Sequence, residues 1–150
     1  MRDLTPYQLP IVNALAAINE RSGNRYPAPV LFEHLRRRVI ERGFQSCLLL
    51  AFDNDRLKSG REIEDCVCGM LTLDLFEDEI GSQVAMISRA WCDPGMAMEL
   101  WPVAKPIIWE WAKARNCVRI QCQSERDSAW ARWLKNDGFE VKETILEVAL

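Results

Sequence analysis

Three strand-like runs follow one another in the middle of the chain, with only turn-forming segments between them. The runs cover residues 44–52, 66–76 and 83–91 and are rich in apolar, strand-forming residues. Turn signals follow the first two runs, at residues 53–55 and 81–82. Strands that succeed one another without an intervening helix favour an antiparallel meander. The chain is therefore restricted to folds built around a largely antiparallel sheet.

Helical spacing of apolar residues predicts two helices before this meander and two after it. They cover about residues 5–22, 30–43, 98–115 and 128–138, with Pro102 as an alternative start for the third and Asp127 or Ser128 capping the fourth. Further strand-like runs at 118–123 and 140–150 follow the last two helices. We expect one domain over residues 1–150, with the order α-α-β-β-β-α-β-α-β. This is an α/β (α+β) fold with a mixed, mostly antiparallel sheet flanked by helices.

The segment between the first two strand-like runs, residues 54–65, is polar and contains the pair Ser59-Gly60. We interpret this segment as a long hairpin loop. Gly69 lies inside the second run, where a glycine often marks a β-bulge. Both features are compatible with the meander.

The charge and hydropathy of the chain argue against nucleic-acid and membrane partners. Its net charge is −3, so it lacks the broad positive field that attracts phosphate groups. No apolar run approaches the roughly 20 residues that a membrane span needs. Residues 1–10 carry Arg2, Asp3 and two prolines and do not resemble a signal peptide. These observations predict a cytoplasmic protein.

The cysteines and the single histidine do not suggest metal or thiol chemistry. None of the six cysteines is arranged as C-x-x-C, and most lie in or beside apolar runs. We interpret them as free, partly buried thiols in a reducing compartment. His34 is the only imidazole, and it falls in a segment with a core-facing helical pattern. We therefore expect neither a zinc site nor a cysteine–histidine pair.

Two short motifs carry a resemblance to a known family. Residues 111–117 (WAKARNC) resemble a helix end where an Ala-basic-x-x-Gly run is common. Residues 134–140 (LKNDGFE) resemble a Tyr-x-x-x-Gly-Phe signature at the end of the following helix. With their order of elements, these motifs make residues 83–150 similar to the N-acetyltransferases of the GNAT superfamily. Residues 44–78 match more loosely, and the family's opening strand is nearly absent.

This resemblance implies acetyl-CoA as cofactor, held where the strand at 83–91 and the strand at 118–123 splay apart. In the family, backbone N–H groups at the start of the intervening helix hold the pyrophosphate, since a helix N-terminus offers free donors and a positive dipole end. The corresponding cofactor-binding residues here are Ser88, Ala90, Gly95, Met96, Ala97 and Met98.

The family's phosphate loop begins with Arg or Gln and ends with Gly, one residue, then Gly or Ala. Gly95-Met96-Ala97 matches only the last three positions, and Cys92 takes the first. Aligning the helix ends instead places the family glycines at Glu99 and Trp101. Glu99 brings a negative charge to this region, and Pro102 and Pro106 each lack an N–H donor.

The resemblance also implies positions for the reacting groups. The family's tyrosine, which protonates the departing thiolate, falls on Leu134, and its asparagine falls on Asp127. A general base could come from Asp74, Glu77 or Asp78 at the end of the second strand. We take Asp127 and Glu77 as the candidate catalytic residues. The oxyanion would meet a backbone N–H of the strand at 83–91, and proximity would supply most of the rate.

Two functions are consistent with this sequence. The first is an acyl-CoA-dependent N-acyltransferase acting on a small-molecule or protein amine. The second is a catalytically inactive GNAT-fold structural or interaction protein, such as a bacteriophage internal or accessory protein. The second hypothesis draws on six tryptophans, a high number for this length. Aromatic faces often build interfaces, so tryptophan-rich faces could hold a second copy or a protein partner.

Overall fold

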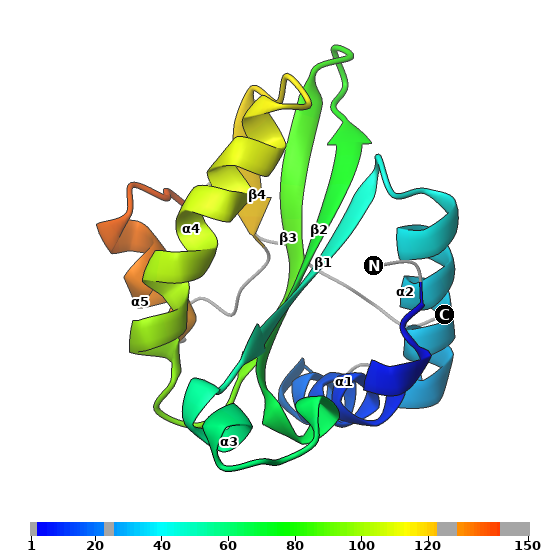
Figure 1. Cartoon of the computed structure of the whole chain (residues 1–150). Helices are drawn as coiled ribbons and strands as arrows, with labels where there is room; N and C mark the ends of the chain where they lie inside the picture. The colour runs from blue at the N-terminus through cyan, green and yellow to red at the C-terminus, as the bar shows by residue number, and fades with distance from the viewer. Residues whose placement is uncertain (1–2, 23–25, 123–128, 142–150) are drawn as a thin grey trace.

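The sheet contains four strands in the order β1-β2-β3-β4, shown in Figure 1. The computed structural model describes residues 3–22, 26–122 and 129–141. Antiparallel pairing joins the three consecutive strands β1 Ser46–Phe52, β2 Val67–Glu77 and β3 Gln83–Cys92. The fourth strand, β4 Arg119–Cys122, pairs in parallel with β3. The predicted meander and mixed sheet are therefore confirmed.

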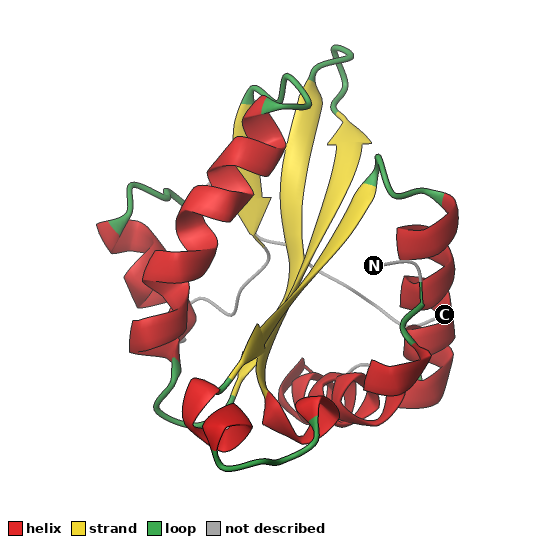
Figure 2. Cartoon of the chain, in the orientation of Figure 1, coloured by secondary structure: helices red, strands yellow, loops and turns green. Residues whose placement is uncertain are grey.

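Helices cover both faces of this sheet (Figures 1 and 2). One face carries α1 Gln8–Ser22 and α2 Ala28–Glu41, preceded by a 3-10 turn at Thr5–Tyr7. The other face carries α4 Ala97–Lys113 and α5 Ala129–Asn136. The predicted strand at 140–150 lies outside the described residues, except for residues 140–141, which have no regular structure.

The segment after β1 is not the plain hairpin loop that its polar sequence predicts. It contains a short helix, α3 Asn54–Lys58, and a 3-10 turn, Ile63–Cys66. The side chain of Asp53 accepts hydrogen bonds from the N–H groups of Asp55 and Arg56, at 2.9 and 3.1 Å. Asp53 is thus an N-cap, so the turn signal after β1 starts a helix. The register shift between β1 and β2 falls next to Gly69, where Cys68 is the extra residue.

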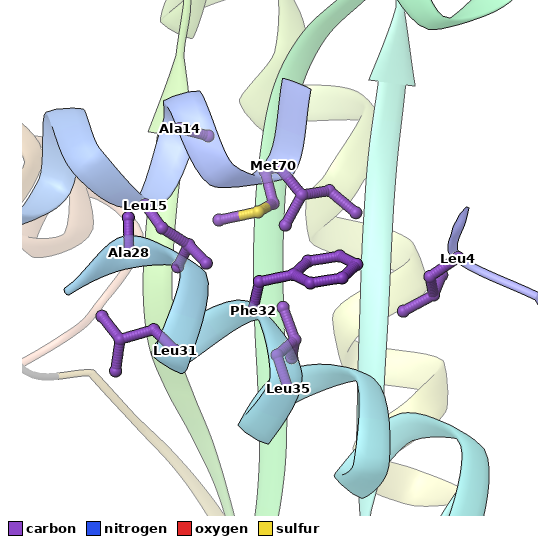
Figure 3. Packing of buried hydrophobic residues seen from close by; sticks show 9 residues of the cluster. Leu4, Ala14, Leu15, Ala28, Leu31, Phe32, Leu35 and Met70 are labelled. Carbon is purple, nitrogen blue, oxygen red and sulfur yellow. The ribbon is translucent and has the colours of Figure 1, made fainter. Parts of the chain in front are cut away.

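The core between α1, α2 and the sheet is built around Phe32. Figure 3 shows this side chain at the centre of the cluster, and it is only 1% exposed. Ile11 and Leu15 of α1, Leu35 of α2 and Met70 of β2 belong to the same cluster. Both helices therefore hold the sheet through one continuous apolar layer.

The second core lies between the sheet, α4 and α5, and tryptophans dominate it. Trp101 is buried and makes edge-to-face contacts with Trp130, at 4.9 Å between centroids, and with Trp109, at 6.3 Å. All six tryptophans are buried or half-buried. All except Trp91 join α4 to α5 and the sheet, and Trp91 packs against the core beneath α1 and α2. The large apolar side chains exposed on α4 are Met98, Val103 and Ile107. An interface through tryptophan-rich faces stays a prediction.

Two prolines lie inside α4 without ending it. Pro102 and Pro106 are both exposed, on the solvent side of the helix. A proline inside a helix removes the hydrogen bond to the carbonyl four residues earlier. Because both prolines face solvent, water can reach the two carbonyl groups that are left free.

Some other features of the described residues bear on function. No helix there is both long and apolar enough to cross a membrane. No three ligating side chains gather there as a metal site would require. All six cysteines are free thiols, and burial raises the pKa of Cys47, Cys68 and Cys122 among them.

The core position of Ile108 provides a test of the packing. Ile108 of α4 is 0% exposed, so Ile108→Ala should lower the free energy of unfolding by about 2–5 kcal/mol. Val103 on the same helix is 64% exposed, and Val103→Ala should change it by less than about 0.5 kcal/mol. Urea unfolding of the two variants measures both values, and equal losses would contradict the packing described.

Asp137 predicts a pH dependence of stability. Its carboxylate accepts hydrogen bonds from Lys105 Nζ and Trp101 Nε1, which hold its pKa below the usual value. A lowered folded-state pKa means that this stabilisation is complete above the unfolded value of about 3.9 and is lost as the pH falls further. Asp137→Asn should therefore lower the Tm at pH 7.

The difference in Tm between the wild type and Asp137→Asn should narrow as the pH falls from about 5 toward 2. Thermal unfolding followed by circular dichroism at several pH values measures this difference. A difference that stays constant over that range would show that Asp137 contributes through packing and not through its charge.

Candidate active site

Among the described residues, the parallel pairing between β3 and β4 extends only part-way along β3. The ladder starts at Val84 and ends where Ile87 pairs with Cys122. Strand β3 continues to Cys92, and its pairing with β2 continues with it. Within the described residues, the last five residues of β3 thus have a strand on only one side. Their free edge leads toward the start of α4.

A β-bulge lies directly at the point where this pairing ends. Thr72 of β2 pairs with Arg89, and Leu73 pairs with Ile87, so Ser88 is the extra residue. A bulge leaves its extra residue outside the ladder and changes the direction of the neighbouring side chains. Ser88 and Arg89 are both opposite Thr72 and can face the same side of the sheet.

The start of α4 offers unpaired backbone donors. Gly95 has a φ of +84°, a left-handed conformation that favours glycine, and Met96 is the N-cap residue. The N–H of Met96 bonds to the carbonyl of Asp93 at 3.1 Å. The N–H groups of Ala97 and Met98 have no partner among the described residues. They lie at the N-terminus of a 17-residue helix, an end that favours negative charge.

The residues expected to disturb this helix start have different effects. Pro102 and Pro106 lie beyond the first turn of α4, so the donors they lack are not the donors at the helix end. Glu99 is exposed within the first turn and brings its negative charge to that end. It opposes the binding of an anion there.

Contacts from α3 and β2 hold this helix start in place. Arg56 of α3 bonds to the Asp93 carboxylate at 2.7 Å, and Figure 1 shows α3 beside the start of α4. Leu100, in the first turn, lies against Gly69 of β2, where an added Cβ would be 2.7 Å from Leu100 Cδ1. The Leu100 side chain therefore packs directly over Gly69, and any side chain at position 69 would have to displace it.

A polar cluster surrounds the bulge on the α2-facing side of the sheet. The Asp74 carboxylate accepts hydrogen bonds from Ser88 Oγ and from Ser46 Oγ, the latter at 2.8 Å. Arg38 of α2 forms an ion pair with Asp74 at 2.7 Å. Arg89 lies nearby, and burial lowers its pKa while Asp74 opposes that change. The Asp74 side chain is 14% exposed, so this carboxylate is largely shielded from water.

The structure separates the three acids that the sequence offered as a base. Glu77 pairs with Gln83 at the far end of the β2–β3 hairpin. It is five residues of β3 away from Ser88, about 16 Å at the usual rise per residue. Asp78 accepts from the N–H groups of Ser82 and Ile80 and so closes the hairpin turn. Only Asp74 contacts the bulge.

The other residues that the sequence suggested for the site do not gather at the Ser88 bulge. Ala90 is exposed on the free part of β3, close to Ser88. Asp127 lies outside the described residues. Leu134 is 4% exposed and belongs to the tryptophan core, so the position of the family's tyrosine is occupied by a packing side chain. The sequence indicated no role for Ser46 and Arg89, since no local motif marks them.

Known proteins match this chain through structure and not through sequence. No protein-family model matches it, and no curated protein is significantly similar to it. Glucosamine-6-phosphate N-acetyltransferase from Arabidopsis thaliana has a TM-score of 0.70 at 7% identity, over 98% of this chain and 93% of its own. Ribosomal-protein-alanine N-acetyltransferase from Brucella melitensis biovar Abortus 2308 has a TM-score of 0.61 at 13% identity, over 95% of this chain and 92% of its own. A transcriptional regulator from Bacillus halodurans C-125 has a TM-score of 0.67 at 21% identity, over 100% of this chain and 97% of its own.

The chain therefore has the GNAT fold, with a mixed sheet between two pairs of helices. The resemblance seen in the sequence is confirmed at the level of the fold. The identities lie between 7% and 21% for these three structures, so the comparison describes the fold alone.

The contact between Gly69 and Leu100 predicts a coupling between β2 and α4. Gly69→Ala should lower the free energy of unfolding by about 1 kcal/mol or less, because the new methyl group displaces the flexible end of the Leu100 side chain. In a Leu100→Ala background, Gly69→Ala should cost much less stability, since the side chain that it would displace is absent. A double-mutant cycle by urea unfolding measures this coupling, and strictly additive losses would contradict it.

Proposed function

We propose that this protein is an acyl-CoA-dependent N-acyltransferase. One observation carries the proposal: in the part of the chain that the structure describes, the β3–β4 pairing extends only to the Ser88 bulge, and the edge of β3 beyond it leads to the unpaired donors that start α4. A cofactor with a diphosphate and an amide-containing arm fits this arrangement. Two of the structural neighbours are named as N-acetyltransferases, which supports the proposal.

Each part of the cofactor has a matching group in the chain. The N–H groups of Ala97 and Met98 suit a diphosphate, because a helix N-terminus stabilises negative charge. The free edge of β3 from Ser88 to Cys92 can pair with the amides of an extended arm, as an added strand does. Bound acetyl-CoA would supply an acyl thioester near the bulge.

The polar cluster at the bulge suits an attacking amine. The Ser88 hydroxyl donates to Asp74, so its lone pairs remain available to accept a proton from the amine. As the nitrogen–acyl carbon bond forms, the amine proton passes to Ser88 Oγ and the Ser88 proton passes to Asp74. The carbon–sulfur bond then breaks, and the thiolate takes its proton from water, because Leu134 has none to give. We propose Asp74 as the base in place of Glu77.

Cofactor binding provides the direct test. Titration with acetyl-CoA, followed by calorimetry or tryptophan fluorescence, should give a micromolar Kd. Thiol release in the presence of an amine would establish transfer. No binding up to about millimolar acetyl-CoA would overturn the proposal, because that limit leaves only about 4 kcal/mol of binding free energy.

Glu99→Gln should strengthen acetyl-CoA binding about two- to fivefold, because it removes a negative charge beside the diphosphate site. The gain should decrease as salt is added. Glu110→Gln is the matched control, since Glu110 is exposed near the other end of the same helix. An equal effect of the two variants would show that only net charge matters and that the diphosphate lies elsewhere.

A second candidate is a catalytically inactive interaction protein, such as a phage accessory protein. The observation that favours it is the burial of Leu134 in the tryptophan core, which leaves no acid at the family's tyrosine position. The exposed Met98, Val103 and Ile107 on α4 would then be the surface for a partner. A stable oligomer in light scattering, together with no acetyl-CoA binding, would support this candidate.

A further inference from the structure

Thr72 has a buried hydroxyl group without a partner. The residue is 1% exposed, and its Oγ1 makes no hydrogen bond among the described residues. Thr72 alternates with Leu71 and Leu73, which face α4, so it faces α1 and α2. A buried hydroxyl without a partner is unfavourable, and such groups in native proteins call for an explanation.

Arg89 lies directly across the strand pair from Thr72 and is also without a partner. Its guanidinium makes no hydrogen bond or ion pair within the part of the chain that the structure describes. The residue is half-buried. A guanidinium removed from water without a counter-charge is destabilising unless a ligand provides one.

The neighbouring charges leave this location with one positive charge in excess. Asp74 is the acid that interacts with Arg89, and it is already bonded by Arg38, Ser46 and Ser88. Arg38 and Arg89 thus bring two positive charges against one carboxylate. The cluster is open to solvent on the side of Arg38, whose side chain is 44% exposed.

We propose that Arg89 and Thr72 form a subsite for a carboxylate group carried by the acceptor amine. One guanidinium presents two parallel N–H donors that match the two oxygens of a carboxylate, and the Thr72 hydroxyl adds a third donor. A single excess positive charge balances a carboxylate, whereas a phosphate would bring about two negative charges.

The position of this subsite defines the class of acceptor. Arg89 follows Ser88 in the sequence, and both are opposite Thr72 in the bulge. The amine site at Ser88 and Asp74 and the carboxylate site at Arg89 and Thr72 are therefore adjacent. The acceptor is an amino acid-like molecule, with its amine and its carboxylate a few bonds apart. This inference rests on the proposed acyl transfer for the identity of the amine site.

Matched amines test the subsite. Glycine, β-alanine and 4-aminobutyrate are each compared with the amine that has a methyl group in place of the carboxylate: ethylamine, propylamine and butylamine. Binding is measured by saturation-transfer NMR in the presence of coenzyme A, and transfer by thiol release from acetyl-CoA. At least one amino acid should bind about tenfold or more tightly than its partner amine.

Substitutions then assign the preference to these residues. Arg89→Met should abolish the preference for the carboxylate, and Arg89→Lys should keep part of it, because the charge remains but the two-donor geometry is lost. Thr72→Val should weaken binding of the amino acid severalfold and leave its partner amine unchanged. Arg37→Met, on the exposed side of α2, is the matched control and should behave as the wild type.

Thermal unfolding separates this role from a structural one. Arg89→Met and Thr72→Val each remove an unsatisfied polar group, so their Tm should be equal to or above that of the wild type. A raised Tm with an unchanged carboxylate preference would overturn the subsite. So would the absence of any preference in the wild type, including the case in which no amine binds.

Binding and transfer also distinguish the two proposals. Carboxylate-dependent binding without acetyl transfer would retain the subsite and overturn the proposed acyltransferase. Transfer to amines without regard to the carboxylate would retain the acyltransferase and overturn the subsite.

Discussion

The structure depends on an asymmetry in the pairing of β3. The strand is paired with β2 from Gln83 to Cys92, whereas within residues 26–122 its pairing with β4 extends only as far as Ile87. Full pairing on both sides would leave no backbone groups free, and a strand free on both sides would lose its position. The continuous β2 pairing fixes the free part of β3 while leaving its other edge available. Everything proposed about the site follows from this arrangement.

The electrostatics of the site follow from where charged groups are removed from water. Asp74 is shielded but has three donors, so its charge is compensated within the fold. Arg89 is half-buried and has only the nearby charge of Asp74, with no hydrogen bond or ion pair of its own among the described residues. The first arrangement stabilises the sheet beneath the bulge. The partly buried charge of Arg89 is unfavourable, and an anion bound in the proposed subsite would lower its free energy.

The sequence predicted the layers, because the periodicity of apolar residues records which face of each element is buried. It missed α3, since Asp53 has the same appearance as a turn residue and as an N-cap. For the candidate site, the sequence predicted the start of α4 through Gly95 and gave Asp74 as one of three acids that could act as a base. The contacts of Asp74 could not be predicted, because Ser46 is 28 residues away in sequence and the pairing depends on strand register. The bulge leaves no local signal at all.

The bulge also determines how easily such a site can be lost. Thr72 pairs with Arg89 and Leu73 with Ile87, so removal of Ser88 alone would convert this stretch into a regular ladder. The side chains on either side would keep their faces, and Trp91 would still reach the core beneath α1 and α2. A single-codon deletion would thus remove the Ser88 hydroxyl and preserve the scaffold. The group on which the proposed chemistry depends is therefore separable from the architecture by one short mutational step.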